Sequence, residues 1–344
     1  MSEALGSLEE LPADYRAALE QHGLAPLWPN LRALLPSATP RPTTQTGHWP
    51  YESLRPLLMR AGELTPVERA ERRVLVLSDP GRGIGAMQAT ATLYLGMQLL
   101  LPGETAPAHV HTPSAVRLVV EGEGGYTVVR GEKLPMEEGD VVLTPGGLWH
   151  DHGHDGDEPV VWLDILDLPL FVYLEGAYAN PGPLQAPLER VESSQAEYAA
   201  AGLVPSRGAA AVASPYPLLR FPWARVEPAL RQLAAETGGS AELDYVDPET
   251  GKDVLPTLSL TAMYLPAGTT LAPPLRSTAA AFHVVGGSGT STVGEREVSW
   301  QAKDTFSAPV FAGITHVADT DAFLVRAEDR PLQKKLGYYE ERTP

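Results

Sequence analysis

The amino-acid sequence predicts an all-β dominated protein, in which two double-stranded β-helix (jelly-roll) barrels follow an N-terminal helical extension. Three observations support this fold class. Short β-branched segments bounded by glycine and proline recur in two regions, the two regions align as copies of each other, and the residues before them have helical patterns. With 344 residues, 43% of them hydrophobic, the chain is long enough for two domains with separate cores.

Residues 1–73 are predicted to form the mostly helical extension. Amphipathic spacing predicts short helices over residues 13–21 and 31–35, which are separated by proline-rich connections. A further helix is expected to open with Thr65 as its N-cap and Pro66 at the first helical position, because that position needs no backbone N–H donor.

Residues 74–171 are predicted to form the first barrel. Strands are expected over residues 115–120, 125–130 and 140–144, since each segment is short, rich in β-branched residues and bounded by glycine or proline. A tight turn at residues 130–132 would join the second of these strands to the next one.

Three histidines of this region, His109, His111 and His150, form the strongest functional motif. Side chains at i and i+2 of a strand point to the same face, which in a closed barrel can be the interior, and a later antiparallel strand can bring the third histidine beside them. Three neutral imidazoles leave positions open on a metal for an organic anion and dioxygen, so the motif predicts oxidative chemistry, although imidazoles also accept manganese, cobalt, nickel or zinc. The surrounding spacing is Gly103, five residues, His109, one residue, His111, and later Gly139, five residues, Pro145, Gly147 and His150.

The same window contains two more of the nine histidines of the chain. His152, two residues after the third predicted ligand, is a candidate catalytic or supporting residue, because an imidazole with a pKa near neutrality can accept or donate a proton. His154 has no assigned role.

Residues 172–239 are predicted to connect the barrels and to contain a helix over residues 226–237, and residues 240–344 are predicted to form the second barrel, with strands resuming near Leu255. The barrels look like duplicates when residues 119–120 are aligned with residues 284–285, an alignment that also brings Gly139-Asp140 over Lys303-Asp304 after a one-residue shift.

The second copy has lost the paired ligands. Pro274 lies opposite His109 and Arg276 opposite His111 in this alignment, and His316 alone remains, two residues away from the place of His150. We therefore expect the second barrel to be degenerate, with no complete metal site, and to support the fold or an oligomer interface.

Composition excludes several classes of protein. The chain has no cysteine, which excludes disulfides and thiolate ligands. A formal net charge of -17 without a basic block argues against binding nucleic acid or an anionic membrane. No apolar run reaches the roughly 20 residues of a membrane span, and the first residues do not resemble a secretory signal, so a cytoplasmic protein is expected.

Residues 107–117, together with residues 120–124, 143–145 and 149–153, resemble the gentisate 1,2-dioxygenase family, which includes the related salicylate and 1-hydroxy-2-naphthoate dioxygenases. The resemblance is specific between His109 and Asp164 and extends more weakly over nearly the whole chain. It implies a bicupin enzyme with one Fe(II) per chain that opens the ring of an aromatic ortho-hydroxy acid with dioxygen and is commonly a homotetramer.

The substrate that the resemblance implies first is gentisate, which would be converted to maleylpyruvate; salicylate and 1-hydroxy-2-naphthoate stay open. Relatives often have arginine between the paired histidines, a tryptophan on the strand before them and an aromatic segment before the third ligand. This chain has Val110, Tyr94 and Gly146-Gly147-Leu148 at these places, so the width and polarity of its pocket should differ.

Six further residues are candidates for the site. Arg117 lies an even number of residues beyond His111 and should face inward, where a guanidinium with no evident structural partner suits a substrate carboxylate. Asp164 is a carboxylate within an apolar strand, and the resemblance makes it an orienting partner. The resemblance also places Arg73, Tyr94 and Gln98 in the substrate pocket, with His152 beside the metal.

Two other classes of protein share this fold. A zinc cupin isomerase usually adds a glutamate ligand, which is missing near Ala115 and Val116, and has more basic residues for phosphate. A non-enzymatic bicupin, such as a storage or ligand-sensing protein, would tolerate the loss of ligands in both copies, whereas one copy here keeps all three.

Overall fold

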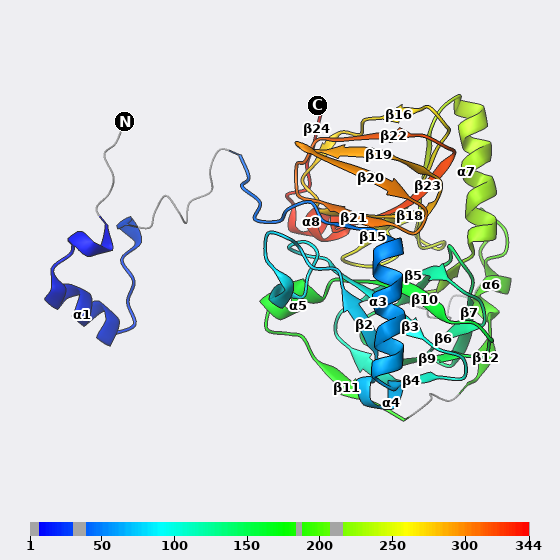
Figure 1. Cartoon of the computed structure of the whole chain (residues 1–344), viewed down its shortest axis with the longest axis horizontal. Coiled ribbons are helices and arrows are strands. Elements are labelled where there is room, and N and C mark those ends of the chain that lie inside the picture. The colour runs from blue at the N-terminus through cyan, green and yellow to red at the C-terminus, as the bar shows by residue number, and fades with distance from the viewer. Residues whose placement is uncertain (1–6, 30–38, 184–187, 207–215, 344) are drawn as a thin grey trace. The chain divides into compact units, whose positions relative to one another are not determined.

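The computed structural model describes residues 7–29, 39–183, 188–206 and 216–343 (Figure 1). Contacts divide the chain into two compact units, residues 1–42 and 43–344. The first unit contains the short helix η1 (Leu8–Glu10) and helix α1 (Ala13–Gln21), whose bounds are those predicted. The helix predicted over residues 31–35 lies outside the described residues.

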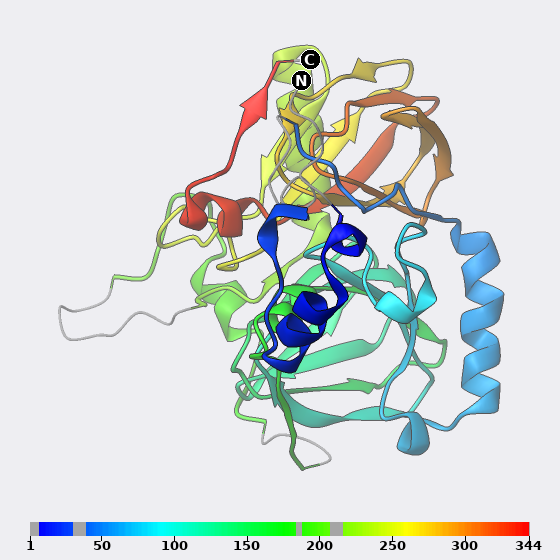
Figure 2. The same cartoon turned by 90° about the vertical axis from the view of Figure 1, so that its left-hand side faces the viewer.

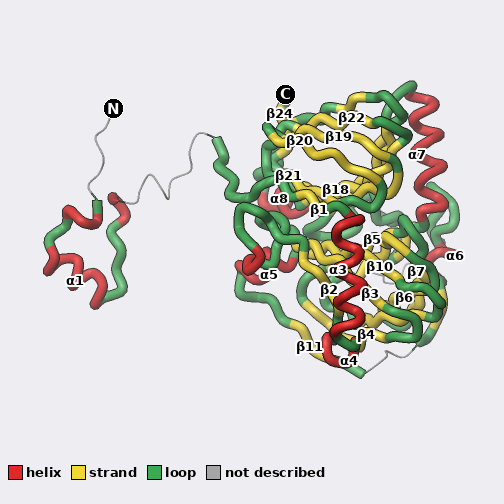
Figure 3. The backbone as a smooth tube through the Cα atoms, in the orientation of Figure 1, coloured by secondary structure: helices red, strands yellow, loops and turns green. Residues whose placement is uncertain are grey.

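The first barrel consists of two six-stranded sheets with the orders β13-β8-β5-β10-β3-β2 and β11-β4-β9-β6-β7-β12. In Figure 3 its strands form the lower of two groups. The predicted strands are confirmed as β5, β6 and β8. The strands are β2 (Arg73–Val76), β3 (Tyr94–Leu100), β4 (Thr105–His111), β5 (Ala115–Glu121), β6 (Gly125–Val129), β7 (Glu132–Met136), β8 (Val141–Thr144), β9 (His150–His154), β10 (Val160–Leu166), β11 (Ala179–Pro181), β12 (Arg190–Val191) and β13 (Arg220–Phe221).

The second barrel has a six-stranded sheet of order β1-β21-β18-β23-β15-β14, a four-stranded sheet of order β16-β22-β19-β20, and the pair β17-β24. Its strands resume at Ala241, earlier than predicted. They are β1 (His48–Trp49), β14 (Ala241–Asp244), β15 (Ser259–Leu265), β16 (Thr270–Leu271), β17 (Leu275–Arg276), β18 (Ala280–Gly286), β19 (Ser288–Val293), β20 (Arg296–Gln301), β21 (Thr305–Ala308), β22 (Ile314–Ala318), β23 (Ala322–Glu328) and β24 (Glu341–Arg342).

Helices flank the barrels, and three of them differ from expectation. Helix α7 (Trp223–Thr237) begins before the predicted start at Val226. Helix α4 (Val67–Ala70) begins one residue later than predicted, because Thr65 lies in the extended connection after α3 and Pro66, with ψ 149°, is the residue before the helix. The last strand of the first barrel ends at Leu166, and helix α5 follows. The helices of residues 43–344 are α3 (Tyr51–Leu64), α4, η2 (Ile84–Ala86), α5 (Leu168–Tyr173), α6 (Ser193–Glu197), α7 (Trp223–Thr237) and α8 (Arg330–Leu336).

The two barrels are copies, as the sequence predicts. Five strands of one sheet, β8-β5-β10-β3-β2, match β21-β18-β23-β15-β14 in order. The backbone N–H of Val119 donates to the carbonyl of Asp140 (3.0 Å), and that of Val284 donates to the carbonyl of Asp304 (2.9 Å). Lys303 has a positive φ of 75°, and its counterpart Gly139 has one of 87°, a conformation in which glycine is usually found.

The structure places His316 as the sequence alignment does, two residues away from the position of the third ligand. His316 pairs with Ser291 across the sheet as His152 pairs with Thr127, so it is the counterpart of His152. The residue two positions earlier, Ile314, therefore stands where the first barrel has its third histidine.

In each barrel, one edge strand of a six-stranded sheet lies outside the stretch of sequence that forms the rest of that barrel. β1 precedes the first barrel but pairs with β21 of the second, and β13 precedes the second barrel but pairs with β8 of the first. A proline follows each strand and a helix begins directly after it, α3 along β2 and β3 and α7 along β14 and β15 (Figures 1 and 2). The two barrels have thus exchanged one strand each.

Two buried aspartates hold these exchanged segments. Asp304 accepts the first backbone N–H of α3, from Tyr51, at 2.8 Å, and Asp140 accepts the first backbone N–H of α7, from Trp223, at 2.8 Å. Asp140 also pairs with Arg220 at 2.7 Å. One hydrophobic cluster extends through both barrels, and a second cluster lies within the second barrel.

Helices of the described residues do not meet the length and apolarity that crossing a membrane requires.

Candidate active site

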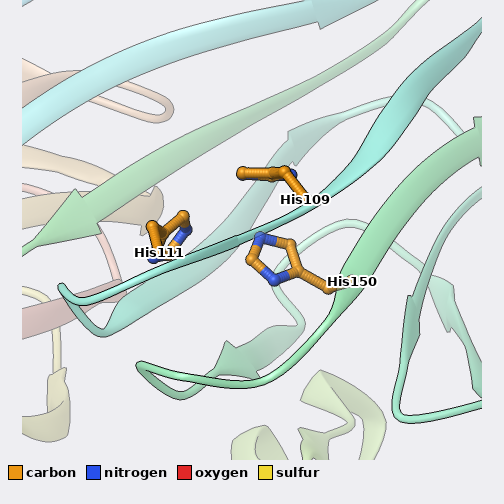
Figure 4. Close-up of side chains that lie close together, drawn as sticks. All are labelled: His109, His111 and His150. Atoms are coloured by element: carbon orange, nitrogen blue, oxygen red, sulfur yellow. The ribbon is translucent and has the colours of Figure 1, made fainter. Parts of the chain in front are cut away.

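The three predicted metal ligands meet in the first barrel. His109 and His111 lie on β4 and His150 on β9, and His109 and His150 are direct partners across the two strands. Their ring centroids are 4.2–5.0 Å apart, and one nitrogen of each ring lies within 4.8 Å of the other two (Figure 4). Among the described residues, this is the one group of three or more potential ligands that could hold a metal.

Backbone carbonyls orient two of the rings. Nδ1 of His111 lies 2.7 Å from the carbonyl of Pro113, and Nδ1 of His150 lies 2.9 Å from that of Leu148. With Nδ1 as the donor, Nε2 of each ring is left as a metal ligand. Nε2 of His150 is buried and has no hydrogen-bond partner among the described residues, so its lone pair is free to bind a metal.

Burial keeps the three imidazoles neutral. It lowers the pKa of His109 to about 2, with Arg72 adding to the effect, and that of His111 to about 4; the pKa of His150 is also well below its usual value. A metal ligand must be deprotonated, and these rings already are at neutral pH. The cluster contains no carboxylate, so the donor set is three neutral nitrogens, as a three-histidine metal centre requires.

A cavity of about 430 Å³ opens beside His109 and His111. Its volume lies in the range of small-molecule sites. Its walls combine a few charged groups with an apolar surface. The lining residues are Arg72, Val74, Tyr94, Gln98, His109, His111, Pro113, Ala115, Arg117, Asp164, Leu166, Leu168, Ala177, Tyr178 and Ala179.

Arg117 and Asp164 lie side by side in this wall, on the neighbouring strands β5 and β10. Arg117 Nε is 3.3 Å from Asp164 Oδ1, and Arg117 Nη1 also donates to Thr144. The sequence had suggested no structural partner for Arg117, and the structure supplies two. Burial lowers the pKa of Arg117 to about 10, a value at which the guanidinium still carries its charge at neutral pH.

Asp164 faces inward and is buried, not solvated. Its Oδ1 accepts a hydrogen bond from the indole of Trp162 at 3.1 Å. Burial raises the pKa of this carboxyl, and the nearby guanidinium of Arg117 opposes that effect. The ion pair with Asp164 holds the guanidinium of Arg117 in the cavity wall.

The arginine that faces the cavity is Arg72, which directly precedes β2, and not the predicted Arg73. Arg73 is buried on the opposite side, where it pairs with Glu104 and lies near the carbonyl of Gly62. Arg72 Nη2 donates to the carbonyl of Pro107 at 2.9 Å and lies 2.5 Å from Nδ1 of His109. A shift of one residue along a strand moves a side chain to the other face, which explains the difference.

Tyr94 and Gln98 both line the cavity, as the resemblance implies. The hydroxyl of Tyr94 lies over Gly96, where an added Cβ would be only 2.6 Å away. Nε2 of Gln98 is buried and has no partner among the described residues, so it is a free donor for a ligand.

His152 is adjacent to the third ligand but is not one of the lining residues of the cavity. Its ring centroid is 5.7 Å from that of His150, it packs against Trp162, and its Nδ1 lies 2.9 Å from the hydroxyl of Thr127. Burial lowers its pKa well below the usual value. His154 is further from the site, and its two nitrogens contact the carbonyl of Glu158 and the N–H of Gly156.

The matching region of the second barrel is filled. Only about 20 Å³ remains between residues that include Pro274, Arg276 and Ile314, at the places of the three ligands. A buried ion pair between Arg326 and Glu328 (3.0 Å) occupies its interior. No set of potential ligands gathers in the described part of this barrel.

Known proteins resemble the chain over its whole length. The Cupin domain family matches residues 96–166. A gentisate 1,2-dioxygenase of Ralstonia sp is 50% identical, over 99% of this chain and 97% of its own length. A 5-aminosalicylate 1,2-dioxygenase of Comamonas sp is 33% identical, over 93% of this chain and 87% of its own. The crystal structure of salicylate 1,2-dioxygenase from Pseudoaminobacter salicylatoxidans with gentisate has a TM-score of 0.90 at 31% identity and covers 99% of this chain and 96% of that one.

Proposed function

Because the chain belongs to the gentisate 1,2-dioxygenase family, a family of ring-cleaving oxidoreductases, we propose that it converts gentisate to maleylpyruvate with one Fe(II) per chain. The observation that carries the proposal is the cluster of three neutral imidazoles, two of which line a cavity together with two guanidinium groups. Both atoms of dioxygen would enter the product, and no external reductant would be needed.

His109, His111 and His150 would hold the iron. When bound, a ferrous ion keeps its full double charge among neutral ligands and supplies the attraction for a chelating anion and the redox capacity for reaction with dioxygen. The donors fit it because all three rings are neutral and the Nδ1 contacts of His111 and His150 leave Nε2 free.

Arg117 and Arg72 are the proposed carboxylate clamp. The cavity wall contains these two cations and one carboxylate, that of Asp164. One positive charge is therefore uncompensated, which matches the single carboxylate of an aromatic hydroxy acid. Guanidinium groups suit this role because their donors match the spacing of carboxylate oxygens. Asp164 would fix the orientation of Arg117.

The apolar part of the wall would hold the ring of the substrate and exclude water. Leu166, Leu168, Pro113 and Ala115 supply it. Gln98 Nε2, which has no partner among the described residues, can donate to an oxygen substituent of the ring, and Tyr94 narrows the cavity beside it. These polar groups favour gentisate, which carries a second hydroxyl, over salicylate and 1-hydroxy-2-naphthoate, which stay as the alternative substrates.

His152 is proposed to act through His150. A direct proton transfer to the substrate would need a place in the cavity wall, and His152 lies behind the ligand instead. The contact between His152 Nδ1 and the hydroxyl of Thr127 holds the His152 ring in place, and the ring of His150 packs beside it. We therefore treat His152 as a positioning residue for the third ligand.

The test is oxygen consumption after anaerobic reconstitution with Fe(II). Gentisate, salicylate and 1-hydroxy-2-naphthoate are supplied in parallel, and the ring-opened product is followed by absorbance. Uptake of one dioxygen per gentisate, absent from metal-free and zinc-loaded protein, is the expected result. If the zinc-loaded protein converted a substrate without taking up oxygen, a zinc cupin isomerase would be favoured. If no metal supported turnover of any substrate, a non-enzymatic bicupin would be favoured.

A cytoplasmic location and a homotetramer remain proposals that rest on the family. The homotetramer is tested by light scattering of the purified protein after size-exclusion chromatography. A mass of one chain would contradict it. The light-scattering test is independent of the oxygen-uptake test, because oxygen uptake needs no assumption about assembly.

A further inference from the structure

The second barrel reaches the metal centre through one buried aspartate. Asp167 lies between β10 and α5, between two residues that line the cavity, Leu166 and Leu168. One carboxylate oxygen accepts the backbone N–H of Ser114 at 2.8 Å. The other accepts the hydroxyl of Thr257, which belongs to the segment before β15 of the second barrel.

Ser114 ends the short loop that orients a metal ligand. This loop follows His111 directly, and the carbonyl of Pro113 is the acceptor for Nδ1 of His111 at 2.7 Å. The turn before the third ligand is fastened to the same loop, since the N–H of Gly146 donates to Ser114 Oγ (3.2 Å) and that of Gly147 to the carbonyl of His111 (2.8 Å). A movement of Ser114 would therefore be transmitted to the ring of His111.

The duplicated fold contains a second copy of this contact that leads to no ligand. Asp329 precedes α8 as Asp167 precedes α5, each helix has proline in its first turn, and Asp329 accepts the hydroxyl of Thr92 from the first barrel at 3.0 Å. Its other oxygen accepts from Gln333 at 3.1 Å. The two barrels thus exchange reciprocal threonine–aspartate hydrogen bonds, and in the described residues only one of them continues to a histidine of the metal cluster.

We propose that Asp167 and Thr257 are positioning residues of the metal centre, through which the degenerate second barrel holds His111 in its ligand orientation. This inference rests on the proposed metal site. It assigns the second barrel a direct role in the chemistry of the first, because without Thr257 the carboxylate of Asp167 would have one anchoring donor fewer in a buried position.

The test compares the metal affinity of variants at the two equivalent aspartates, Asp167 and Asp329. Asp167→Ala and the control Asp329→Ala each remove a buried carboxylate and a threonine hydrogen bond between the barrels, so both should lower the thermal midpoint. Affinity for Co²⁺, added as the metal alone to the full-length apo protein, is measured by competition with a chelator. Asp167→Ala should weaken it about tenfold, the low end for residues that orient ligands, while Asp329→Ala leaves it within twofold of wild type.

Two conservative variants separate hydrogen bonding from general damage. Asp167→Asn keeps an acceptor for Ser114 and gains a donor toward Thr257, so it should restore metal affinity to within about twofold of wild type. Thr257→Val should weaken Co²⁺ binding by a few fold, whereas Thr92→Val should not. The absorption spectrum of bound Co²⁺ should change in Thr257→Val and stay as in wild type in Thr92→Val.

The outcomes distinguish this inference from the proposed function. Equal affinities in Asp167→Ala, Asp329→Ala and wild type would overturn the inference while the metal site stands. Asp167→Asn as defective as Asp167→Ala would also overturn it, because the hydrogen bonds would then not be what matters. Failure of wild-type protein to bind Co²⁺ or Fe²⁺ would instead contradict the proposed function.

Discussion

Arg117 is the residue on which the proposed substrate binding depends most. It is buried in the cavity wall, paired with Asp164, and still carries its charge at neutral pH. A buried cation with one anionic partner and a second cation nearby is favourable only if another anion can join them. The substrate carboxylate would be that anion.

Arg117→Ala should therefore raise the apparent KM and lower kcat/KM by about 10- to 100-fold, the effect of losing a charged hydrogen bond of about 1.5–3 kcal/mol. Iron content should stay near wild type, because Arg117 is not a ligand. Steady-state oxygen uptake and metal analysis measure the two quantities. Unchanged kinetics would remove Arg117 from the clamp, and loss of iron would show that it supports the metal site in another way.

Variants of the neighbouring residues Arg72 and Arg73 test which of the two arginines binds the substrate carboxylate. Arg72→Ala should lower kcat/KM about tenfold or more with little change in the denaturation midpoint, since it lines the cavity. Arg73→Ala should do the reverse, because its buried guanidinium pairs with Glu104 away from the cavity. Kinetics and urea denaturation of both variants test this contrast. Equal kinetic defects would place both residues in the site.

The sequence predicted His109, His111 and Arg117 because their spacing along β4 and β5 fixes which face they share, and it predicted His150 as the ligand from a later strand, β9. It could not predict Arg72. The resemblance points to the neighbouring Arg73, and an error of one position selects the opposite face of a strand. The depth of His152 was equally hidden, because spacing indicates a face but not a distance from the cavity.

At the scale of elements, the exchanged strands β1 and β13 distinguish this fold from two barrels joined by a linker. Each strand has only two residues, too few for a pattern in the sequence to reveal. Duplication of the strands β5 and β18 was visible in sequence because glycine-containing turns follow both strands at a similar spacing. The location of a two-residue partner strand depends on tertiary contacts alone.

Asp140 and Asp304 should differ in how much they stabilise these exchanged segments. Asp304→Ala leaves the buried N–H of Tyr51 without its acceptor and should cost about 1–3 kcal/mol of unfolding free energy. Asp140→Ala should cost more than this, because it also removes the most buried of the three carboxylates that pair with Arg220, while Glu137 and Glu192 remain.

Urea denaturation of both variants at neutral pH measures the difference. Their denaturant m-values should match that of wild type, since the surface exposed on unfolding stays the same. A smaller loss in Asp140→Ala than in Asp304→Ala would contradict the assignment of the ion pair as the stronger anchor.

At the scale of the whole molecule, buried neutral histidines make stability depend on pH. His283 and His316, both in the second barrel and outside the metal cluster, have pKa values that burial lowers to about 3. Below pH ~6.5 the unfolded chain binds protons at these rings that the folded protein does not. The stability they contribute is therefore full above pH ~6.5 and is lost as the pH falls from there toward about 3.

His316→Gln should flatten this dependence by up to about 1.4 kcal/mol per pH unit between pH ~6 and ~4. Gln can keep a hydrogen bond to Ser291, the partner of His316 at 2.7 Å. Unfolding free energies of the variant and wild type at several pH values test the slope. A slope equal to that of wild type would show that His316 takes up its proton in the folded state.

Asp167 and Asp329 act in the opposite direction. Burial raises the pKa of each carboxyl to about 6, so the stability linked to their protonation is full below pH ~3.8 and is lost as the pH rises through about 6. These two groups should partly offset the histidines between pH ~4 and ~6, and the net acid sensitivity should come from the two histidines, whose pKa values are shifted further.

The exchanged strands also decide what an isolated half of this protein could be. A fragment that ends before Arg220 would carry β1 with no second barrel to receive it, and its own sheet would lack the edge that β13 supplies. The complementary fragment would have the mirror-image defect. Neither product of such a cut is a self-contained module, so the second barrel cannot be removed by truncation without damaging the first.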